Sequence, residues 1–310
     1  MPIPVPALEN HIQGFLNSLR EQNTYASSTR SAYAADLKRL RAFLHGQLKG
    51  QPVGAAELTP ESVQAFLASE QGQGFRPNTL MRRRASLRQF VLYLSEQNQP
   101  VETGELLGLL AMNQVSQAKQ AAPQTLDQQD IERMLAVIQT ARQPYARRDH
   151  AILALLLETG LSVSDLIALD TGDIDLENSR ARLRTLKNAP KKETWVPLGS
   201  AYQPVKIYLE AGRPEFNLPA RENGLFVSQM GARMSRQNVW QILIHLGSAA
   251  GLPLAPTPRL LRHTAVQRLL QAGAPTAHIQ ALLGHRNSVS TQALLRRLRS
   301  SQALMKVPQP

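Results

Sequence analysis

The chain has 310 residues, with 35 lysines and arginines against 23 aspartates and glutamates, which gives a formal charge of +12. Its sequence pI is about 10.4. This charge favours a polyanionic partner without choosing among DNA, RNA and an anionic membrane. No cysteine is present, which excludes disulfide bonds and thiolate zinc sites and is compatible with a reducing cytoplasm.

The sequence gives no sign of export or of membrane insertion. Its first six residues lack the basic start and the apolar core of a signal peptide. The longest clean apolar run, residues 151–157, is far shorter than the ~20 residues that cross a bilayer. We therefore expect a cytoplasmic protein with no membrane partner. A prior of roughly 100–200 residues per domain predicts two domains.

Residues 1–110 are predicted to form a helical N-terminal domain. One helix has a single apolar face, formed by Tyr33, Leu37, Leu40 and Leu44. Ser27 and Ser28 precede this face and are candidate N-caps. Another helix is expected to begin at Thr59-Pro60, where a capping residue is followed by proline at the first helical position.

A third helix is predicted over residues 78–97. Its buried stripe consists of Leu80, Leu87, Val91 and Leu94. Its other face carries Arg82, Arg83, Arg84 and Arg88. Because no acidic residue falls between Arg76 and Glu96, we interpret this charge as locally uncompensated and suited to a phosphate backbone. The alternative is a solvated helix face with local ion pairs.

Residues 111–125 lose helical periodicity and are predicted to be a linker. After it, Asp127 is expected to cap a helix bearing Ile131, Leu135 and Ile138. A nearly all-apolar helix through residues 151–157 is predicted to be central to the second core and to end at Gly160. Two short strands, residues 181–186 and 193–198, are expected around a loop, and the remainder of residues 126–310 is predicted to be helical.

Three motifs follow in this second domain. The most specific lies within Thr257–Leu294, and it contains Arg259-Leu260-Leu261-Arg262-His263-Thr264 and then Leu282-Leu283-Gly284-His285. The second runs from Arg148-Asp149 into Thr159-Gly160-Leu161-Ser162-Val163-Ser164-Asp165-Leu166. The third and weakest is the lysine-bearing loop followed by Val196-Pro197-Leu198. In order and spacing these motifs resemble the tyrosine recombinase, or phage integrase, family, in particular its Xer type.

The resemblance covers nearly the whole chain and implies a mainly α fold. A helical, SAM-like core-binding domain would be followed by a mostly helical catalytic-type domain with a small β-sheet. Members of the family cut DNA through a tyrosine that forms a 3′-phosphotyrosyl link, while two arginines, histidines and a hairpin lysine stabilise and protonate the reacting phosphate. Such fixed cations are what phosphoryl transfer requires. The resemblance implies double-stranded DNA as partner and no cofactor.

Some family positions are kept in this chain. Arg262 matches the second arginine, and His285 matches the histidine of the Gly-His motif. Lys187 is the best match to the hairpin lysine, while Lys191 and Lys192 stay open as alternatives because the loop is longer than usual. The predicted DNA-binding residues are Arg76, Arg82, Arg83, Arg84, Arg88, Arg259, Arg262 and His285.

Three family positions are altered. Ser162 stands where the first arginine is expected, Arg259 replaces a histidine, and Leu294 occupies the place of the nucleophilic tyrosine. No tyrosine follows Tyr208. Joint loss of the nucleophile, a cation and a proton-transfer group predicts a pseudoenzyme, which binds DNA and assists or regulates recombination or integration beside an active recombinase or by self-association.

Three alternatives remain open at this stage, and a metal site is discarded. The chain could be an active recombinase with another nucleophile, for which Ser288, Ser290 and Thr291 are candidates with His285 as base. It could be an interaction module that assembles with other recombinases and hardly touches DNA. Arg262 and His285 could be packing residues of an inherited scaffold. A metal site is disfavoured, because the spacing of His263, His278 and His285 fits no compact zinc pattern.

Overall fold

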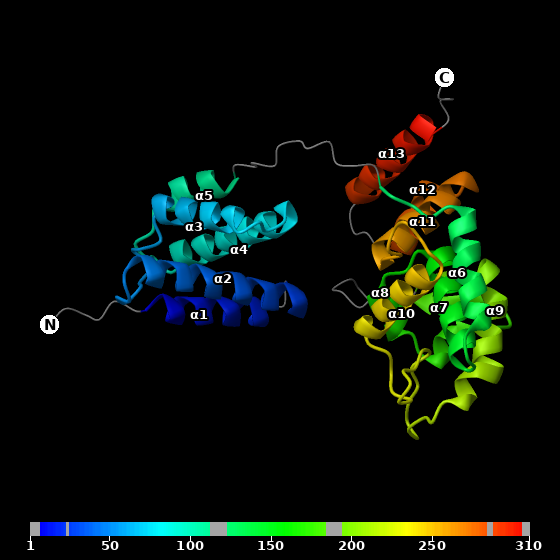
Figure 1. The fold of residues 1–310 in the computed structure, drawn as a ribbon. Helices are drawn as coiled ribbons and strands as arrows, with labels where there is room; N and C mark the ends of the chain where they lie inside the picture. The colour runs from blue at the N-terminus through cyan, green and yellow to red at the C-terminus, as the bar shows by residue number, and fades with distance from the viewer. Residues whose placement is uncertain (1–6, 23–24, 112–122, 184–193, 284–287, 306–310) are drawn as a thin grey trace. The chain divides into compact units, whose positions relative to one another are not determined.

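The computed structural model describes residues 7–22, 25–111, 123–183, 194–283 and 288–305 (Figure 1). The chain divides into two compact units, Met1–Gln120 and Ala121–Pro310. Each unit has its own apolar core. Most of the predicted linker lies outside the described residues, so the predicted boundaries at residues 110 and 126 stay a prediction.

The described part of the N-terminal unit is helical. Its helices are α1 (Leu8–Glu21), α2 (Ser27–Gln47), α3 (Pro60–Gly72), α4 (Pro77–Glu96) and α5 (Thr103–Ala111). They enclose a core with an aromatic centre, where the Phe15 and Phe90 rings lie 5.5 Å apart and Phe43 and Phe66 also lie 5.5 Å apart. Such tilted ring pairs add to the stabilisation that apolar burial provides.

Of the helix caps predicted from the sequence in this unit, one is confirmed and one is wrong. Thr59 caps α3 as expected, and its hydroxyl accepts a hydrogen bond from the Ser62 amide at 3.2 Å. The predicted capping of α2 by Ser27 or Ser28 is wrong, because the residue before the helix is Ala26 and no side chain caps it. The apolar face predicted for α2 is confirmed, since all four of its residues are buried.

Helix α4 confirms its predicted stripe with one exception. Leu87, Val91 and Leu94 are buried, whereas Leu80 near the N-terminal end is only partly buried. The opposite face differs more, because Arg83 is buried as well, with 3% of its surface exposed. A single helix therefore carries both apolar and charged residues into the core of this unit.

The C-terminal unit is built around α7. Its helices are α6 (Gln128–Thr140), α7 (Tyr145–Thr159), α8 (Val163–Ala168), α9 (Tyr202–Ile207), α10 (Arg236–Ala249), α11 (Pro258–Gln271), α12 (Thr276–Leu283) and α13 (Ser288–Met305). Helix α7 packs against α6, α9 and α11. Asp127 caps α6, and Gly160 ends α7 in the left-handed conformation with φ of 63°, both as predicted.

A small antiparallel sheet lies in this unit. In the described residues it has three strands, β1 (Ile174–Asp175), β2 (Arg180–Leu183) and β3 (Thr194–Pro197), in the order β1-β2-β3. The register pairs Ala181 with Val196 and Arg182 with Trp195. The two predicted strands are confirmed over residues 181–183 and 194–197, residues 184–186 and 193 lie outside the described residues, and β1 was not expected. The connection between β2 and β3, residues 184–193, lies outside the described residues.

The last helices carry a smaller apolar cluster of their own. It joins α11, α12 and α13 through Val266, Ile279, Leu283, Leu295 and Leu298. The mainly helical fold class with a small sheet is thus confirmed. Across the described ranges, no helix combines the length and the apolar composition that a membrane crossing needs.

Candidate functional site

Arg262 lies where three segments of the C-terminal unit converge. It belongs to α11, which begins at Pro258 and is capped by the Thr257 hydroxyl. Its Nη1 atom donates to the Gly160 carbonyl at the end of α7 at 3.1 Å, and its Nη2 atom donates to the Leu283 carbonyl at the end of α12. The residue that matches the second family arginine therefore joins the α7–α8 turn to the end of α12, which precedes His285 in the sequence.

Gly160 allows this convergence for two reasons. Its φ of 63° is costly for other residues, and a Cβ atom placed there would lie 3.3 Å from the Ala265 Cβ on α11. The turn therefore approaches α11 closely enough for its carbonyl to accept from Arg262. Burial lowers the pKa of the Arg262 guanidinium, and the charge of Asp165 opposes that shift. Among the described residues, this guanidinium donates hydrogen bonds to carbonyl groups only.

Ser162 performs a local structural task at the position of the first family arginine. Its hydroxyl accepts a hydrogen bond from the Asp165 amide at 3.2 Å and donates to the Asp165 carboxylate at 2.6 Å. The side chain is the N-cap of α8, which satisfies backbone donors at the helix start. No positive charge is supplied from this position.

Arg259 and His263 lie on the same helix as Arg262. Arg259 is exposed near the N-terminal end of α11. Burial lowers the pKa of His263, and the positive charge of Arg259 lowers it further. The next residue, Thr264, accepts a hydrogen bond from the Leu126 amide at 2.9 Å, so that α11 also anchors the start of this unit. Cationic side chains thus gather along one helix that is fixed at several points.

Leu294, at the nucleophile position, is part of α13 and packs against the apolar cluster of α11, α12 and α13. Thr291, one turn earlier, is fully buried. His285 and the three candidate lysines lie outside the described residues, as do the side chains of Ser288 and Ser290. Arg262 therefore links the turn before Ser162 to Leu283, whose side chain belongs to the same apolar cluster against which Leu294 packs. The roles of His285 and Lys187 stay predictions.

The last tyrosine of the sequence does not offer a substitute nucleophile. Tyr208 is fully buried, and its ring stacks on Phe226 with 5.4 Å between centroids. Burial raises the pKa of its phenol to about 12. A phenol that is buried and hard to ionise cannot reach a DNA phosphate without unfolding of its surroundings.

The arginines of α4 have partners that the sequence did not predict. The prediction that their charge lacks acidic partners is wrong, because Arg82 and Arg83 pair with Asp36 on α2 and Arg83 also pairs with Glu70 on α3. These acids are distant in sequence and were invisible to a local count of charges. Burial leaves Arg83 no surface with which to contact DNA.

The remaining arginines of this predicted set are placed differently. Arg84 donates to the Leu109 carbonyl at 3.0 Å, and burial lowers its pKa. Arg76 and Arg88 are exposed, while Arg82 has 38% of its side chain exposed. Contact of Arg76, Arg82 and Arg88 with DNA stays a prediction that their exposure permits.

The sheet presents a group of residues that the sequence interpretation missed. Trp195 on β3 is 38% exposed, and the guanidinium of Arg180 lies 4.3 Å from the centre of its ring. The Arg182 guanidinium lies 5.8 Å from the same ring. The alternation of Arg180 and Arg182 along β2 was the available signal, because side chains two apart share one face of a strand.

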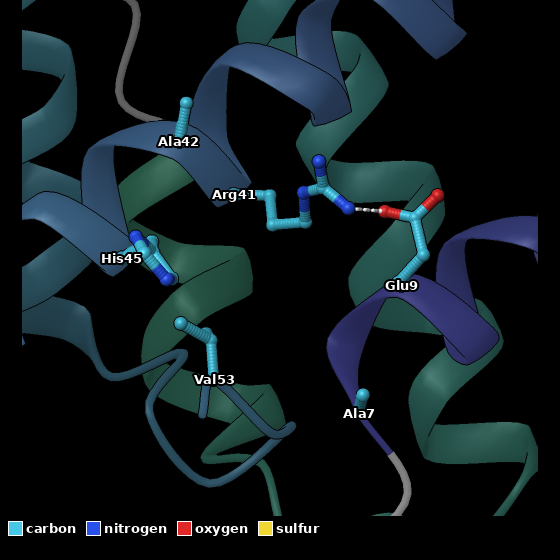
Figure 2. A pocket seen from close by; sticks show the side chains of 6 residues that line it. All are labelled: Ala7, Glu9, Arg41, Ala42, His45 and Val53. Atoms are coloured by element: carbon cyan, nitrogen blue, oxygen red, sulfur yellow. Dashed lines mark hydrogen bonds and ion pairs between the residues drawn. The ribbon is translucent and has the colours of Figure 1, made fainter. Parts of the chain in front are cut away.

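A pocket of about 440 Å³ lies in the N-terminal unit, lined by Ala7, Glu9, Arg41, Ala42, His45 and Val53. Figure 2 shows Arg41 and Glu9 pointing toward each other across it, where they form an ion pair. None of the predicted site residues lines this pocket. Among the described residues no three His, Asp or Glu side chains form a group that could hold a metal ion.

Comparisons with protein families assign both halves of the chain. Residues 124–298 match the model described as "Phage integrase family". Residues 12–98 match the model described as "Phage integrase, N-terminal SAM-like domain". The two matches follow one another in the same order as the two compact units.

Several curated relatives resemble the chain over nearly its full length. Tyrosine recombinase XerD of Listeria monocytogenes is 30% identical over 285 residues, which cover 91% of this chain and 92% of the relative. Tyrosine recombinase XerC of Roseiflexus castenholzii is 29% identical over 294 residues, which cover 92% of this chain and 88% of the relative.

Solved structures share the fold. XerH recombinase bound to a palindromic difH substrate matches with a TM-score of 0.70 at 18% identity, and the match covers 96% of this chain and 90% of that one. A lambda integrase dimer bound to a COC′ core site matches with a TM-score of 0.68 at 16% identity, covering 93% of this chain and 77% of that one.

Proposed function

The chain belongs to the phage integrase family of tyrosine recombinases, and we propose that within this family it is a DNA-binding pseudoenzyme. It binds duplex DNA in the cytoplasm without cutting it and acts as an accessory or regulator of recombination or integration. Its partners are double-stranded DNA and either an active recombinase or further copies of itself. Family membership rests on the matches above, while the loss of cleavage is our inference from the site.

The observation that carries this proposal is the packing of Leu294. A strand-transfer reaction of this family needs a nucleophilic oxygen in line with the leaving group. Leu294 has no such atom, and its side chain is part of the apolar cluster of α11, α12 and α13. The helix that would present the nucleophile is used here to complete a core.

The position of the first family arginine supports the same conclusion. Removing one donor that stabilises developing charge commonly costs about 3–4 kcal/mol of barrier. Ser162 supplies no cation, and its hydroxyl is engaged in capping α8 through Asp165. Two requirements of the chemistry, a nucleophile and a cation, are therefore unmet at positions 294 and 162.

DNA binding is favoured by the charges that remain. Arg262 is partly buried and donates hydrogen bonds to two neutral carbonyl groups, so an anion at this point would replace solvation that burial removes. Arg259 adds a permanent cation where the family has a titrating histidine. The XerH and lambda integrase structures that share this fold are both complexes with DNA.

A binding assay followed by denaturation tests the proposal. A labelled duplex should shift on addition of the protein, and affinity should fall on the order of a thousandfold between about 50 and 200 mM salt if about six phosphates are contacted. Denaturing the same samples should leave no adduct on the DNA, including on a duplex nicked to trap a covalent intermediate.

The other outcomes select the alternatives. A denaturation-resistant adduct linked to a peptide that contains Ser290 or Thr291 identifies an active recombinase with a different nucleophile. Absence of binding at low salt, combined with capture of a recombinase, identifies a protein-interaction module. Either result overturns the proposal of a DNA-binding pseudoenzyme.

A further inference from the structure

Two buried carboxylates lie at the centre of a charged network in the N-terminal unit. Asp36 on α2 has 2% of its surface exposed, and Glu70 on α3 has 3% exposed. Arg83 on α4 is equally buried and pairs with both, with 3.4 Å between its Nε and an Asp36 oxygen. The Phe75 ring supports this arginine, because its centre lies 4.1 Å from the guanidinium.

Each buried acid also holds a second arginine, which reaches it from the surface. Arg82 donates through Nη1 to Asp36 and, at 3.0 Å, to the Ala32 carbonyl. Arg39 donates to a Glu70 oxygen through Nε at 3.2 Å and through Nη2 at 3.0 Å. The network therefore contains more arginines than acids and keeps an excess positive charge.

The two outer arginines keep donors available at the surface. The side chain of Arg82 is 38% exposed, and that of Arg39 is 44% exposed. Within the part of the chain that the structure describes, Nε and Nη2 of Arg82 and Nη1 of Arg39 donate no hydrogen bond. Buried carboxylates thus hold Arg82 through Nη1 and Arg39 through Nε and Nη2. The remaining nitrogen atoms of each guanidinium are still able to donate.

A guanidinium that is already held in place suits a phosphate group better than the guanidinium of a flexible surface arginine does. An unattached arginine loses rotamer entropy when it binds a phosphate, whereas a guanidinium that is already fixed loses less. Arg39 and Asp36 are three residues apart on α2 and share a face of the helix. Arg82 donates to that same face, so the two fixed cations belong to one surface formed by α2 and α4.

We propose that Asp36 and Glu70 are positioning residues for DNA binding, which hold Arg82 and Arg39 as fixed phosphate-binding cations on the α2–α4 surface. This inference rests on the proposed DNA-binding function. It assigns to two buried acids a positive contribution to the affinity for a polyanion. Charge alone predicts the reverse, because removing an acid makes the protein more positive.

The opposite signs of these two expectations define the test. The full chain and its Asp36→Asn variant are titrated with a fluorescein-labelled duplex of random sequence, and circular dichroism verifies folding at the titration temperature. Positioning predicts that Asp36→Asn weakens binding on the order of tenfold, because Arg82 loses its charged acceptor. Glu9→Gln is the matched control, since Glu9 pairs with Arg41 in an exposed ion pair of the same unit (Figure 2). Its binding should be unchanged or slightly tighter.

A second set of variants avoids dependence on a buried substitution. Arg82 is partly exposed, so Arg82→Ala should fold, weaken DNA binding and lower the salt slope by about one. Arg82→Lys keeps the charge and should restore the salt slope without restoring the affinity. A lysine ammonium cannot donate to Asp36 and to a phosphate at once in the fixed planar geometry of a guanidinium. Combining Asp36→Asn with Arg82→Ala should weaken binding no more than Arg82→Ala alone, since Asp36 acts through Arg82.

The outcomes separate this inference from the proposed function. If the unmodified chain does not bind the duplex, the DNA-binding function itself fails. If the chain binds and a folded Asp36→Asn variant binds equally well or more tightly, only the positioning role is overturned. A folded Arg82→Ala variant with unchanged affinity and slope has the same meaning.

Discussion

Arg83 in the N-terminal unit is buried and Arg262 in the C-terminal unit is partly buried, and their partners differ. Arg83 lies between two buried carboxylates, whereas Arg262 donates hydrogen bonds to the carbonyl groups of Gly160 and Leu283. Carbonyl groups orient a guanidinium without neutralising it. The comparison teaches that a buried guanidinium is neutralised in one unit and only oriented in the other, and it is the second arrangement that we propose binds an anion.

The largest effect is expected from restoring the chemistry on the Arg262 side of this comparison. Leu294→Tyr alone should not nick supercoiled plasmid, because position 162 still lacks its cation. Adding Ser162→Arg and Arg259→His should give weak nicking, since a missing charge-stabilising donor accounts for about 3–4 kcal/mol of barrier. Plasmid relaxation on agarose gels measures both variants.

Two results of that experiment revise the site. Nicking by Leu294→Tyr alone means that Ser162 and Arg259 are tolerated. An inactive triple variant that still folds and binds DNA means that the pocket has been remodelled, and the assignment of Arg262, His285 and Lys187 to a phosphate site is then withdrawn.

On the N-terminal side, Arg83→Ala should destabilise the fold by about 3–5 kcal/mol, because it removes the buried partner of Asp36 and Glu70. Urea denaturation followed by circular dichroism gives the free energy of unfolding. Arg88→Ala, on the exposed side of the same helix, is the control and should change stability little. If Arg83→Ala lowers the free energy of unfolding as little as the control does, the buried charge network does not stabilise the fold.

Arg262→Ala tests the other member of the pair. Loss of hydrogen bonds to two carbonyl groups should reduce stability by about 1–3 kcal/mol, less than for Arg83, because no buried acid is left unpaired. DNA affinity should fall as well. Arg268→Ala, exposed on the same helix, controls for loss of charge. Equal effects of the two variants on affinity mean that Arg262 contributes charge only.

The N-cap at position 162 should have a smaller effect. Ser162→Ala removes the acceptor of the Asp165 amide and should lower stability by about 1 kcal/mol. Ser164→Ala on the same helix is the control. Unchanged stability of Ser162→Ala, measured by thermal unfolding, contradicts a capping role for the residue at the altered family position.

The smallest expected effect is a pH dependence at His263. Burial lowers the pKa of this histidine below its usual 6.5, so the unfolded chain binds the proton more strongly. The contribution of neutral His263 to the free energy of unfolding is therefore fully present above about pH 6.5 and is lost as the pH falls through the lowered pKa of the folded chain. Urea denaturation at about pH 7.5 and 5.5 should show a smaller difference for His263→Gln than for the unmodified chain. His278→Gln, at an exposed position on α12, should leave the difference unchanged.

The sequence by itself determined what depends on neighbouring residues. Thr59-Pro60, Asp127 and Gly160 mark helix ends because capping and left-handed backbone are set within one turn. The stripe on α2 predicts its buried face because helical period is local. The order of the motifs identified the family, since a chemical site imposes fixed spacings on the chain that builds it.

Only the tertiary structure decided which charges are neutralised and which side chains are withdrawn from solvent. Asp36 and Glu70 lie far from Arg83 in sequence, so no local pattern could reveal that they share a buried network. The same holds for the carbonyl partners of Arg262 and for the packing of Leu294 in a cluster assembled from three helices. Coulomb and packing interactions depend on distance in space, and the fold alone brings these residues together.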